Sequence, residues 1–227
     1  MTAKRKIARY FRRNTGTRLN PLLSTATACG AVVDVDPDGD VDFVGRLASL
    51  GVALPETHGG TAVFPDFEEL GSREYRSQVK ASLNEAIPLG LEVQNAIAQA
   101  SSVSVSFSES VDICYLDIIS LSLNIAKRLD ELEQQGDKVQ LKQLRRFLRP
   151  DGGNRIVGAV YSGTIELHAN FDGNGKLGFA ASGYDKVAAD IGFKWKQVNE
   201  RTLATDRPVP FAFDAWKWSR GRLRDTD

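Results

Sequence analysis

RIVGAVYSGTIELHANFDGNGKLGFAA, residues 155–181, carries the most regular apolar pattern in the chain. Between residues 163 and 171 every second residue is glycine, isoleucine, leucine, alanine or phenylalanine, and the residues between them are polar. A period of two is typical of a β-strand with one apolar and one polar face. DGNG at 172–175 favours a chain reversal, and residues 176–181 return in the same phase. The stretch therefore predicts a β-hairpin.

Two further stretches alternate in the same way. Residues 101–107, SSVSVSF, predict a strand whose polar face is lined by serine. Residues 184–195 predict another strand, followed by a turn at 199–201 and a return strand from 202 to 205. The apolar face of such strands can pack on the protein's own core or meet the lipid of a bilayer. Periodicity alone leaves both possibilities open.

Helical patterns occupy the middle of the chain. Residues 115–132 predict a helix whose apolar stripe runs either through Ile119 and Leu123 or through Leu121 and Ile125, and Gly136 is expected to stop its polar end. Asp137 is the expected N-cap of a second helix over residues 138–148. The residues expected to face inward on that helix are Val139, Leu141, Leu144 and Leu148.

The first part of the chain predicts smaller elements. Residues 31–35 and 41–44 flank a Pro-Asp-Gly turn and predict a hairpin. Residues 46–50 suit one helical turn, and residues 55–60 read as a loop with a solvated His58. Near the other end, Pro208 and Pro210 indicate that the strand leading to Trp218 lies at a sheet edge.

Residues 2–13 predict a short basic amphipathic helix that Gly16 ends. Its basic residues are Lys4, Arg5, Lys6, Arg9, Arg12 and Arg13. Such a helix can dock on the protein's own sheet or on an anionic membrane surface. The commonest alternative is a solvated helix held by its few apolar residues.

Length and charge limit the protein class. The chain has 227 residues, with 29 Lys and Arg against 29 Asp and Glu. The length suits one large domain or two small ones, and the charge balance argues against a nucleic-acid partner. No run of about 18 apolar residues predicts a transmembrane helix, and the basic N-terminus lacks the apolar core of a secretory signal. We therefore expect a soluble, cytoplasmic form.

Cysteine, histidine and motif content argue against catalysis. Cys29 and Cys114 are far apart in the sequence, which argues against a disulfide framework and fits a reducing compartment. The apolar context of Cys114 predicts a buried small hydrophobe. The sequence contains no P-loop, GxSxG or HExxH motif, and its two histidines leave little for a metal cluster. We expect no enzyme activity and no cofactor or metal.

The order of these elements resembles a bacterial gasdermin, a pore-forming defence protein. Five stretches carry the resemblance: KRKIARYFRRNTGTRLNPLL (4–23), VDFVGRLASL (41–50), SSVSVSFSESVDICYLDI (101–118), RIVGAVYSGTIELHANFDGNGKLGFA (155–180) and RPVPFAFDAWKW (207–218). The resemblance implies an α+β fold, with a twisted, mainly antiparallel β-sheet wrapped by helices. It also implies a pore-forming domain over residues 1–218 and a short C-terminal tail, 219–227, that serves as a possible inhibitory peptide.

The resemblance implies a function as well. A protease removes the tail, the freed domain inserts β-hairpins, and copies of the chain assemble into pores in the inner membrane during defence against phage. The partners are then membrane lipids, the activating protease and further copies of the chain. The alternative is a soluble α+β binding or scaffold module with no membrane activity.

The resemblance assigns three groups of candidate residues. The membrane-inserting candidates are Ile165, Leu167, Phe171, Leu177, Phe179, Val187, Ile191, Phe193 and Trp195. The lipid-headgroup candidates are the basic residues of the first helix named above. The cleavage candidates are Arg220, Arg222 and Arg224. The sequence departs from the family in having no cysteine among residues 1–13 to acylate and only a short tail after Trp218.

Overall fold

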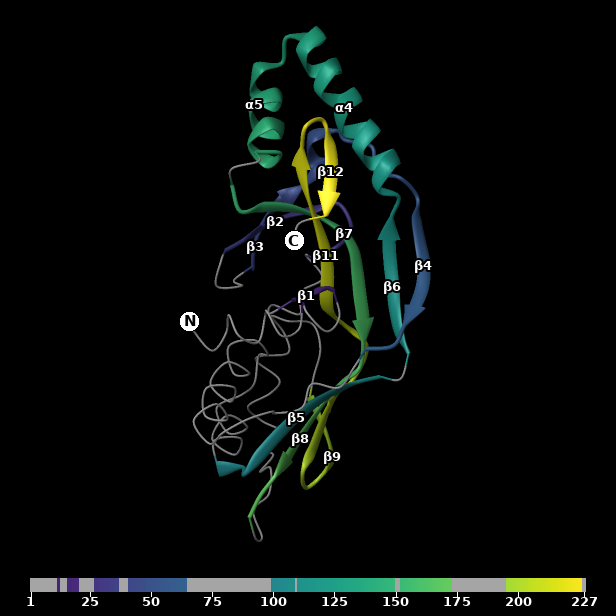
Figure 1. Cartoon of the computed structure of the whole chain (residues 1–227), viewed down its shortest axis with the longest axis vertical. Coiled ribbons are helices and arrows are strands. Elements are labelled where there is room, and N and C mark those ends of the chain that lie inside the picture. Colours follow the sequence, from purple (N-terminus) through teal and green to yellow (C-terminus); the bar gives the residue numbers. More distant parts are fainter. Residues whose placement is uncertain are drawn as a thin grey trace.

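Two long antiparallel strands, β7 (Asn154–Gly163) and β11 (Val209–Ser219), form the centre of the structure (Figure 1). This computed structural model describes residue 12 and residues 16–20, 27–36, 41–64, 99–108, 110–149, 152–172 and 195–225. β7 continues through Thr164 into β8 (Ile165–Asn170), and β10 (Thr202–Thr205) leads into β11. Because β8 also pairs with β10, one two-stranded ribbon runs through both sheets.

The larger sheet surrounds the β7–β11 pair. In the described part of the chain it has eight strands, in the order β1-β11-β7-β2-β3, with β12, β6 and β4 beside this path. Its remaining strands are β1 (Arg18–Leu19), β2 (Ala31–Val35), β3 (Val41–Arg46), β4 (Thr57–Ala62), β6 (Val111–Leu116) and β12 (Arg222–Asp225). β2 and β6 share one edge of β7: β2 pairs with residues 154–156 and β6 with residues 159–162.

The smaller sheet contains β5 (Ser102–Phe107), β8, β10 and β9 (Trp195–Asn199), in the order β5-β8-β10-β9. The strands predicted at 101–107 and 163–171 are therefore confirmed, as is the turn between β9 and β10. Over residues 166–168, β8 pairs with β5 on one edge and β10 on the other, so this part of β8 has no free edge for a hairpin partner. The predicted turn beyond Asp172 and the return at 176–181 lie outside the described residues.

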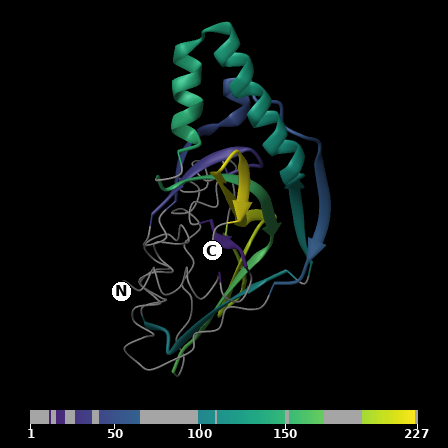
Figure 2. The same cartoon turned by 45° about the horizontal axis from the view of Figure 1, so that its top comes forward.

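The two helices of the described chain lie side by side at one end of the larger sheet (Figures 1 and 2). α4 spans Ile118–Gln135, and α5 spans Lys138–Phe147. Gly136, with a φ of +69°, ends α4 as the sequence predicts. The α+β prediction with antiparallel strands is confirmed; within the described residues the helices gather at one end and do not wrap the sheet.

The N-caps of both helices are aspartates. The Asp117 carboxylate accepts a hydrogen bond of 2.6 Å from the backbone N–H of Ser120, and Asp137 accepts one of 3.1 Å from the N–H of Gln140. Asp137 confirms the sequence prediction. The predicted helix start at residue 115 is wrong, because residues 111–116 form β6 by pairing with both β4 and β7.

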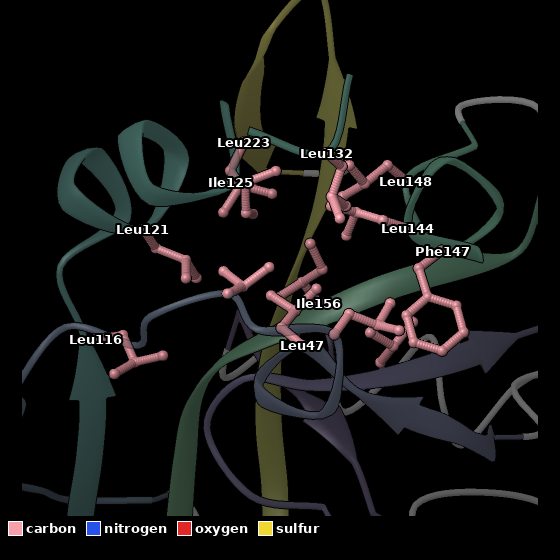
Figure 3. Packing of buried hydrophobic residues seen from close by; sticks show 13 residues of the cluster. Leu47, Leu116, Leu121, Ile125, Leu132, Leu144, Phe147, Leu148, Ile156 and Leu223 are labelled. Atoms are coloured by element: carbon pink, nitrogen blue, oxygen red, sulfur yellow. The ribbon is translucent and has the colours of Figure 1, made fainter. Parts of the chain in front are cut away.

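The main core lies between the helices and the larger sheet. Leu121, Ile125 and Leu132 of α4 are buried, which selects the second of the two predicted stripes. Leu144 of α5 and its C-cap residue Leu148 are buried as predicted, and Leu141 is half-buried against the same cluster. Val139 exposes 77% of its surface, so its predicted inward orientation is wrong. The buried side chains of the helical region pack in one cluster with Leu47, Leu116, Phe147, Ile156 and Leu223 (Figure 3).

Several small elements of the first half match the sequence. β2 and β3 pair as the predicted hairpin, and Leu47–Leu50 forms a single 3₁₀ turn, η1. Gly16 has a φ of +73°, and its N–H donates to the carbonyl of Arg12 at 2.8 Å, which fits the predicted helix end.

Two assignments of strands and loops are corrected. The predicted loop at 55–60 is wrong, because residues 57–62 pair in register with β6 as β4, although His58 is exposed as expected. The predicted edge position of the Pro-rich strand is wrong, because β11 has β7 on one side and β1 and β12 on the other. Pro210 fits there because the β7–β11 register shifts between Pro210 and Ala212, where a backbone N–H is not needed.

Candidate functional site

The smaller sheet separates apolar and polar side chains. One face of β5, β8 and β10 carries Val103, Val105, Ile165, Leu167, Ala169 and Leu203, all buried. Alternation along each strand and the in-register pairing of the strands put these side chains on the same face. Burying one such aliphatic side chain is worth about 1.5–3 kcal/mol, so this face does not remain in water.

The opposite face of the smaller sheet is polar. The Ser106 hydroxyl lies 3.0 Å from Nε2 of His168, and Nδ1 of His168 lies 3.1 Å from the Thr202 hydroxyl. Oε2 of Glu166 lies 3.4 Å from the same Nε2. These groups tie β5, β8 and β10 together through their side chains.

The His168 group does not have the geometry of a hydrolytic triad. In a triad a carboxylate holds the imidazole nitrogen opposite the one that faces the serine. Here Glu166 and Ser106 approach the same nitrogen, and a threonine occupies the other. The arrangement therefore holds strands together and does not prepare a nucleophile.

The sequence-predicted apolar candidates divide into described and undescribed residues. Ile165 and Leu167 are buried in β8, Phe171 is half-buried just after it, and Trp195 is the buried first residue of β9. The residues outside the described part are Leu177, Phe179, Val187, Ile191 and Phe193. Of the basic candidates, only Arg12 is described; it is helical and half-buried.

The C-terminal tail is part of the fold. Arg220 and Gly221, with φ values of 51° and 75°, form a two-residue turn that folds β12 back on β11. Leu223 is buried under α4, and its N–H donates to the Ser122 hydroxyl at 3.1 Å. Arg220 and Arg222 are exposed, whereas Arg224 is half-buried. The boundary predicted at 218/219 falls within β11.

The β11–β12 hairpin was not predicted, although the sequence contains a signal for it. Residues 216–223 read WKWSRGRL, in which an Arg-Gly turn separates two alternating stretches. The abundance of arginine suggests a solvated tail, yet Leu223 between Arg222 and Arg224 supplies the apolar contact. The tail is thus fastened by strand pairing and by one buried side chain.

Aromatic side chains gather where the two sheets meet. Phe107 at the end of β5 stacks on Phe211 of β11 with ring centroids 4.4 Å apart, and Phe64 lies edge-on to Phe211 at 5.1 Å. Phe64 also approaches Tyr161 of β7 at 5.2 Å. The Tyr161 hydroxyl donates to Asp214 at 2.7 Å, and burial is the first cause that raises the pKa of Tyr161. These ring contacts join β5 of the smaller sheet to β7 and β11 of the larger sheet.

The two cysteines are neighbours in space. Sγ of Cys29 lies 3.8 Å from Sγ of Cys114, and both are free thiols. The prediction that Cys114 is buried is wrong: it is exposed, and the residue opposite it on β4 is Gly59, which has no side chain to cover it. Nothing in the local sequence around either cysteine signals this proximity.

Two further kinds of feature are absent from the described residues. No helix in those ranges has the length and apolar character needed to cross a membrane. No group of three or more histidine, cysteine, aspartate or glutamate side chains lies close enough there to hold a metal ion.

Comparison with known proteins finds a structural likeness. The chain is similar to the solved structure of a bacterial gasdermin from Bradyrhizobium tropiciagri, with a TM-score of 0.41 and 12% sequence identity. The similarity covers 88% of this chain and 81% of that chain. No protein-family model and no curated protein matches the chain.

Proposed function

We propose that this chain is a gasdermin-like pore-forming protein, kept inactive by its C-terminal tail and activated when a protease removes that tail. The observation that carries the proposal is the smaller sheet, with one continuous apolar face and one polar face. The order of sequence motifs that resembles bacterial gasdermins gives this sheet its place in the family's mechanism. Antiphage defence at the inner membrane is the biological setting that the resemblance implies.

The alternating stretch of residues 163–171 has the length that membrane insertion requires. A membrane strand needs about 9–11 residues, and the alternating pattern of residues 163–171 fits that range. In the resting fold the apolar side chains Ile165 and Leu167 are buried. In the proposed pore the same side chains face lipid, while Glu166 and His168 face water. In this proposal the apolar face of the smaller sheet leaves its contacts with protein and makes contact with lipid.

The tail has the features of a removable restraint. Arg220 is exposed in a turn, where a protease can reach the backbone more readily than in a paired strand. Cutting there breaks the covalent link between β11 and β12, so that only strand pairing and the burial of Leu223 in the cluster under α4 still hold β12. Loss of β12 uncovers the part of the cluster around Ile125 (Figure 3) and frees the paired edge of β11 at residues 216–219. Among the cleavage candidates, Arg220 is therefore the favoured one.

The first experiment tests activation. A recognition sequence for a specific protease is inserted between Arg220 and Gly221, and the protein is mixed with dye-loaded anionic liposomes. We expect no leakage before the protease is added and leakage after the cut. A control protein with a scrambled recognition sequence should stay inactive with the same protease. Absence of leakage from the cut protein would overturn the proposal.

A second experiment tests which face meets lipid. Phe171 and Asn170 are neighbours on opposite faces of the alternating stretch. Phe171→Cys and Asn170→Cys are made in a Cys29→Ser, Cys114→Ser background and labelled with a polarity-sensitive fluorophore. After the cut we expect the label at 171 to become lipid-exposed, with quenching by spin-labelled lipid, and the label at 170 to stay in water. Equal responses at the two positions would contradict the assigned faces.

Substitutions at positions 170 and 171 are a better test of the two faces than a charged residue introduced at Ile165. Ile165 is 2% exposed in the resting fold, so a charge there destabilises the protein before any membrane is met. Phe171 is half-buried and lies beyond the last residue of β8, so a substitution there disturbs the fold less.

A binding module remains the second candidate function, and one observation favours it. Ile119 and Leu123, one helical turn apart on the outer face of α4, expose 69% and 65% of their surfaces. Exposed apolar neighbours of this kind suit contact with another protein. If Ile119→Ser and Leu123→Ser abolish a protein interaction while the cut protein causes no leakage, the binding module is the better description.

A further inference from the structure

Cys29 and Cys114 lie at a joint in the larger sheet. The edge of β7 is covered by β2 at residues 154–156 and by β6 at residues 159–162. Between them, the carbonyl of Val157 accepts a hydrogen bond of 2.8 Å from the backbone N–H of Gly30, and the carbonyl oxygen of Gly158 lies 3.7 Å from the Cys29 sulfur. Cys29 therefore sits where the β2–β3 hairpin and the β4–β6 pair meet on one strand.

The Cys29 thiol is directed at Cys114. It donates to the carbonyl of Cys114 at 3.1 Å, and the two sulfur atoms are 3.8 Å apart. A disulfide has a sulfur–sulfur distance of about 2.05 Å, so the sulfurs have roughly 1.8 Å to close, a movement within reach of side-chain rotation. The turn at 28–31, closed by a 2.9 Å hydrogen bond from Ala31 to Ala28, keeps the Cys29 backbone in place.

The two sulfurs differ in their surroundings. Cys114 is exposed and Cys29 is half-buried. Burial, and then the nearby Cys114, raise the pKa of Cys29 to about 12, so Cys29 is a poor first nucleophile near neutral pH. An oxidant from solution thus meets Cys114 first, and Cys29 is the neighbour that can complete the reaction.

We propose that Cys29 and Cys114 form a peroxide-sensitive dithiol that closes to a disulfide and fastens the β2–β3 hairpin to β6. The Cys114 thiolate attacks one oxygen of hydrogen peroxide; an S–O bond forms, the O–O bond breaks, and the departing hydroxide takes up a proton to become water. Cys29 sulfur then attacks the Cys114 sulfur and gives its proton to the solvent. The S–S bond forms, the S–O bond breaks, and the second oxygen leaves as water.

The reaction balances and has a structural consequence. The two thiols lose two electrons and two protons in total, and one peroxide is reduced to two waters. The new bond joins residues 85 positions apart, so it closes a long loop in the unfolded chain and stabilises the folded one. It also prevents the β2–β3 hairpin and the β4–β6 pair from separating along β7. This chemistry needs no lipid and no protease, so it goes beyond the proposed pore and is tested without membranes.

The experiment treats the full chain, free of lipid, with hydrogen peroxide. Peptide mapping without reductant should show a peptide pair linked through Cys29 and Cys114, with the loss of two hydrogens. The melting temperature should rise by roughly 5–15 °C and return after reduction with dithiothreitol. The matched controls are Cys29→Ser and Cys114→Ser, neither of which should show the rise.

The controls also report the order of steps. In Cys29→Ser, Cys114 has no resolving thiol and should gain oxygen as sulfinic acid, whereas in Cys114→Ser the half-buried Cys29 should react more slowly. Three results would overturn the proposal: oxygen added to Cys114 of the natural protein without a link, a link only between separate chains, or no change at either cysteine. A failure of this test leaves the leakage experiments unaffected.

Discussion

Gly158 shows how a single residue sets the packing of the central ribbon. It lies in β7 opposite β11, and a β-carbon built on it would come within 2.2 Å of the Trp216 ring. The missing side chain therefore allows the indole to lie flat against the backbone of β7. Glycine is needed at position 158 because a side chain there would collide with Trp216. The backbone conformation does not require glycine, since φ is not positive at Gly158.

Gly158→Ala should destabilise the fold by roughly 1–3 kcal/mol, because the added methyl group forces the Trp216 ring out of its place. Gly60→Ala is the matched control in β4, where the nearest atom to the new methyl group is 3.9 Å away. Its effect should stay within about 0.5 kcal/mol. Urea unfolding of both variants measures the difference, and equal stabilities would contradict the packing described.

Asp117 provides a pH-dependent contribution. The backbone N–H of Ser120 donates to its carboxylate and is the first cause that lowers the pKa of Asp117. A carboxylate whose pKa is lower in the folded protein stabilises the fold above its unfolded pKa, and this contribution is lost as pH falls through the folded pKa.

Asp117→Asn keeps an oxygen acceptor but does not ionise, so it tests that contribution. The natural protein should be more stable than the variant near pH 7, and the difference should shrink below about pH 4, where the unfolded aspartate is already protonated. Urea midpoints measured across this range provide the check. A difference that stays constant down to about pH 2 would contradict the assignment.

At the scale of elements, β12 is a short strand with a large structural role. It pairs with the last residues of β11, and its Leu223 lies beside Ile125 of α4 (Figure 3). The strand connects the C-terminal end of the described chain to the helical core. The sequence indicates a polar tail, and the buried position of Leu223 depends on α4, about 100 residues earlier in the chain.

Leu223→Ala should reduce stability by about 2–5 kcal/mol, because it leaves a cavity in the cluster under α4. Arg222→Ala removes an exposed neighbour on the same strand and should change stability by no more than about 0.5 kcal/mol. Chemical unfolding compares the pair. If the tail is also the proposed restraint, Leu223→Ala should cause partial leakage from liposomes without any cut.

At the scale of the whole molecule, the proposed membrane contact depends on charge placement. The formal net charge is zero, yet six basic residues fall within residues 4–13. Each basic residue near an anionic surface contributes about 1 kcal/mol. The expected attraction is therefore local and sensitive to salt.

Lys4→Gln with Arg5→Gln should weaken binding of the cut protein to anionic liposomes by roughly 30-fold at low salt, from about 2 kcal/mol in total. Lys138→Gln with Lys142→Gln removes the same charge from exposed positions on α5 and should have little effect. Liposome co-sedimentation at two salt concentrations measures both variants. An equal loss of liposome binding in both variants would place the membrane contact outside residues 4–13.

The sequence by itself determined the features that arise from local interactions. Alternation predicts β5 and β8, aspartate caps and glycine stops define α5 and the end of α4, and the Pro-Asp-Gly turn predicts the β2–β3 hairpin. Each depends on residues within a few positions of one another, where backbone geometry and side-chain hydrogen bonds act directly. The separation of apolar and polar side chains onto opposite faces of the smaller sheet is likewise visible in the sequence.

Only the tertiary structure decided which elements lie together. β4 has no alternation and becomes a strand because β6 pairs with it, β11 is internal despite its prolines, and both edges of β8 over 166–168 are taken by strands far away in the chain. It likewise placed Leu223 in the core and brought Cys29 to Cys114. The physical reason is that strand pairing uses backbone groups common to all residues, so the choice of partner depends on how the whole chain buries its apolar faces.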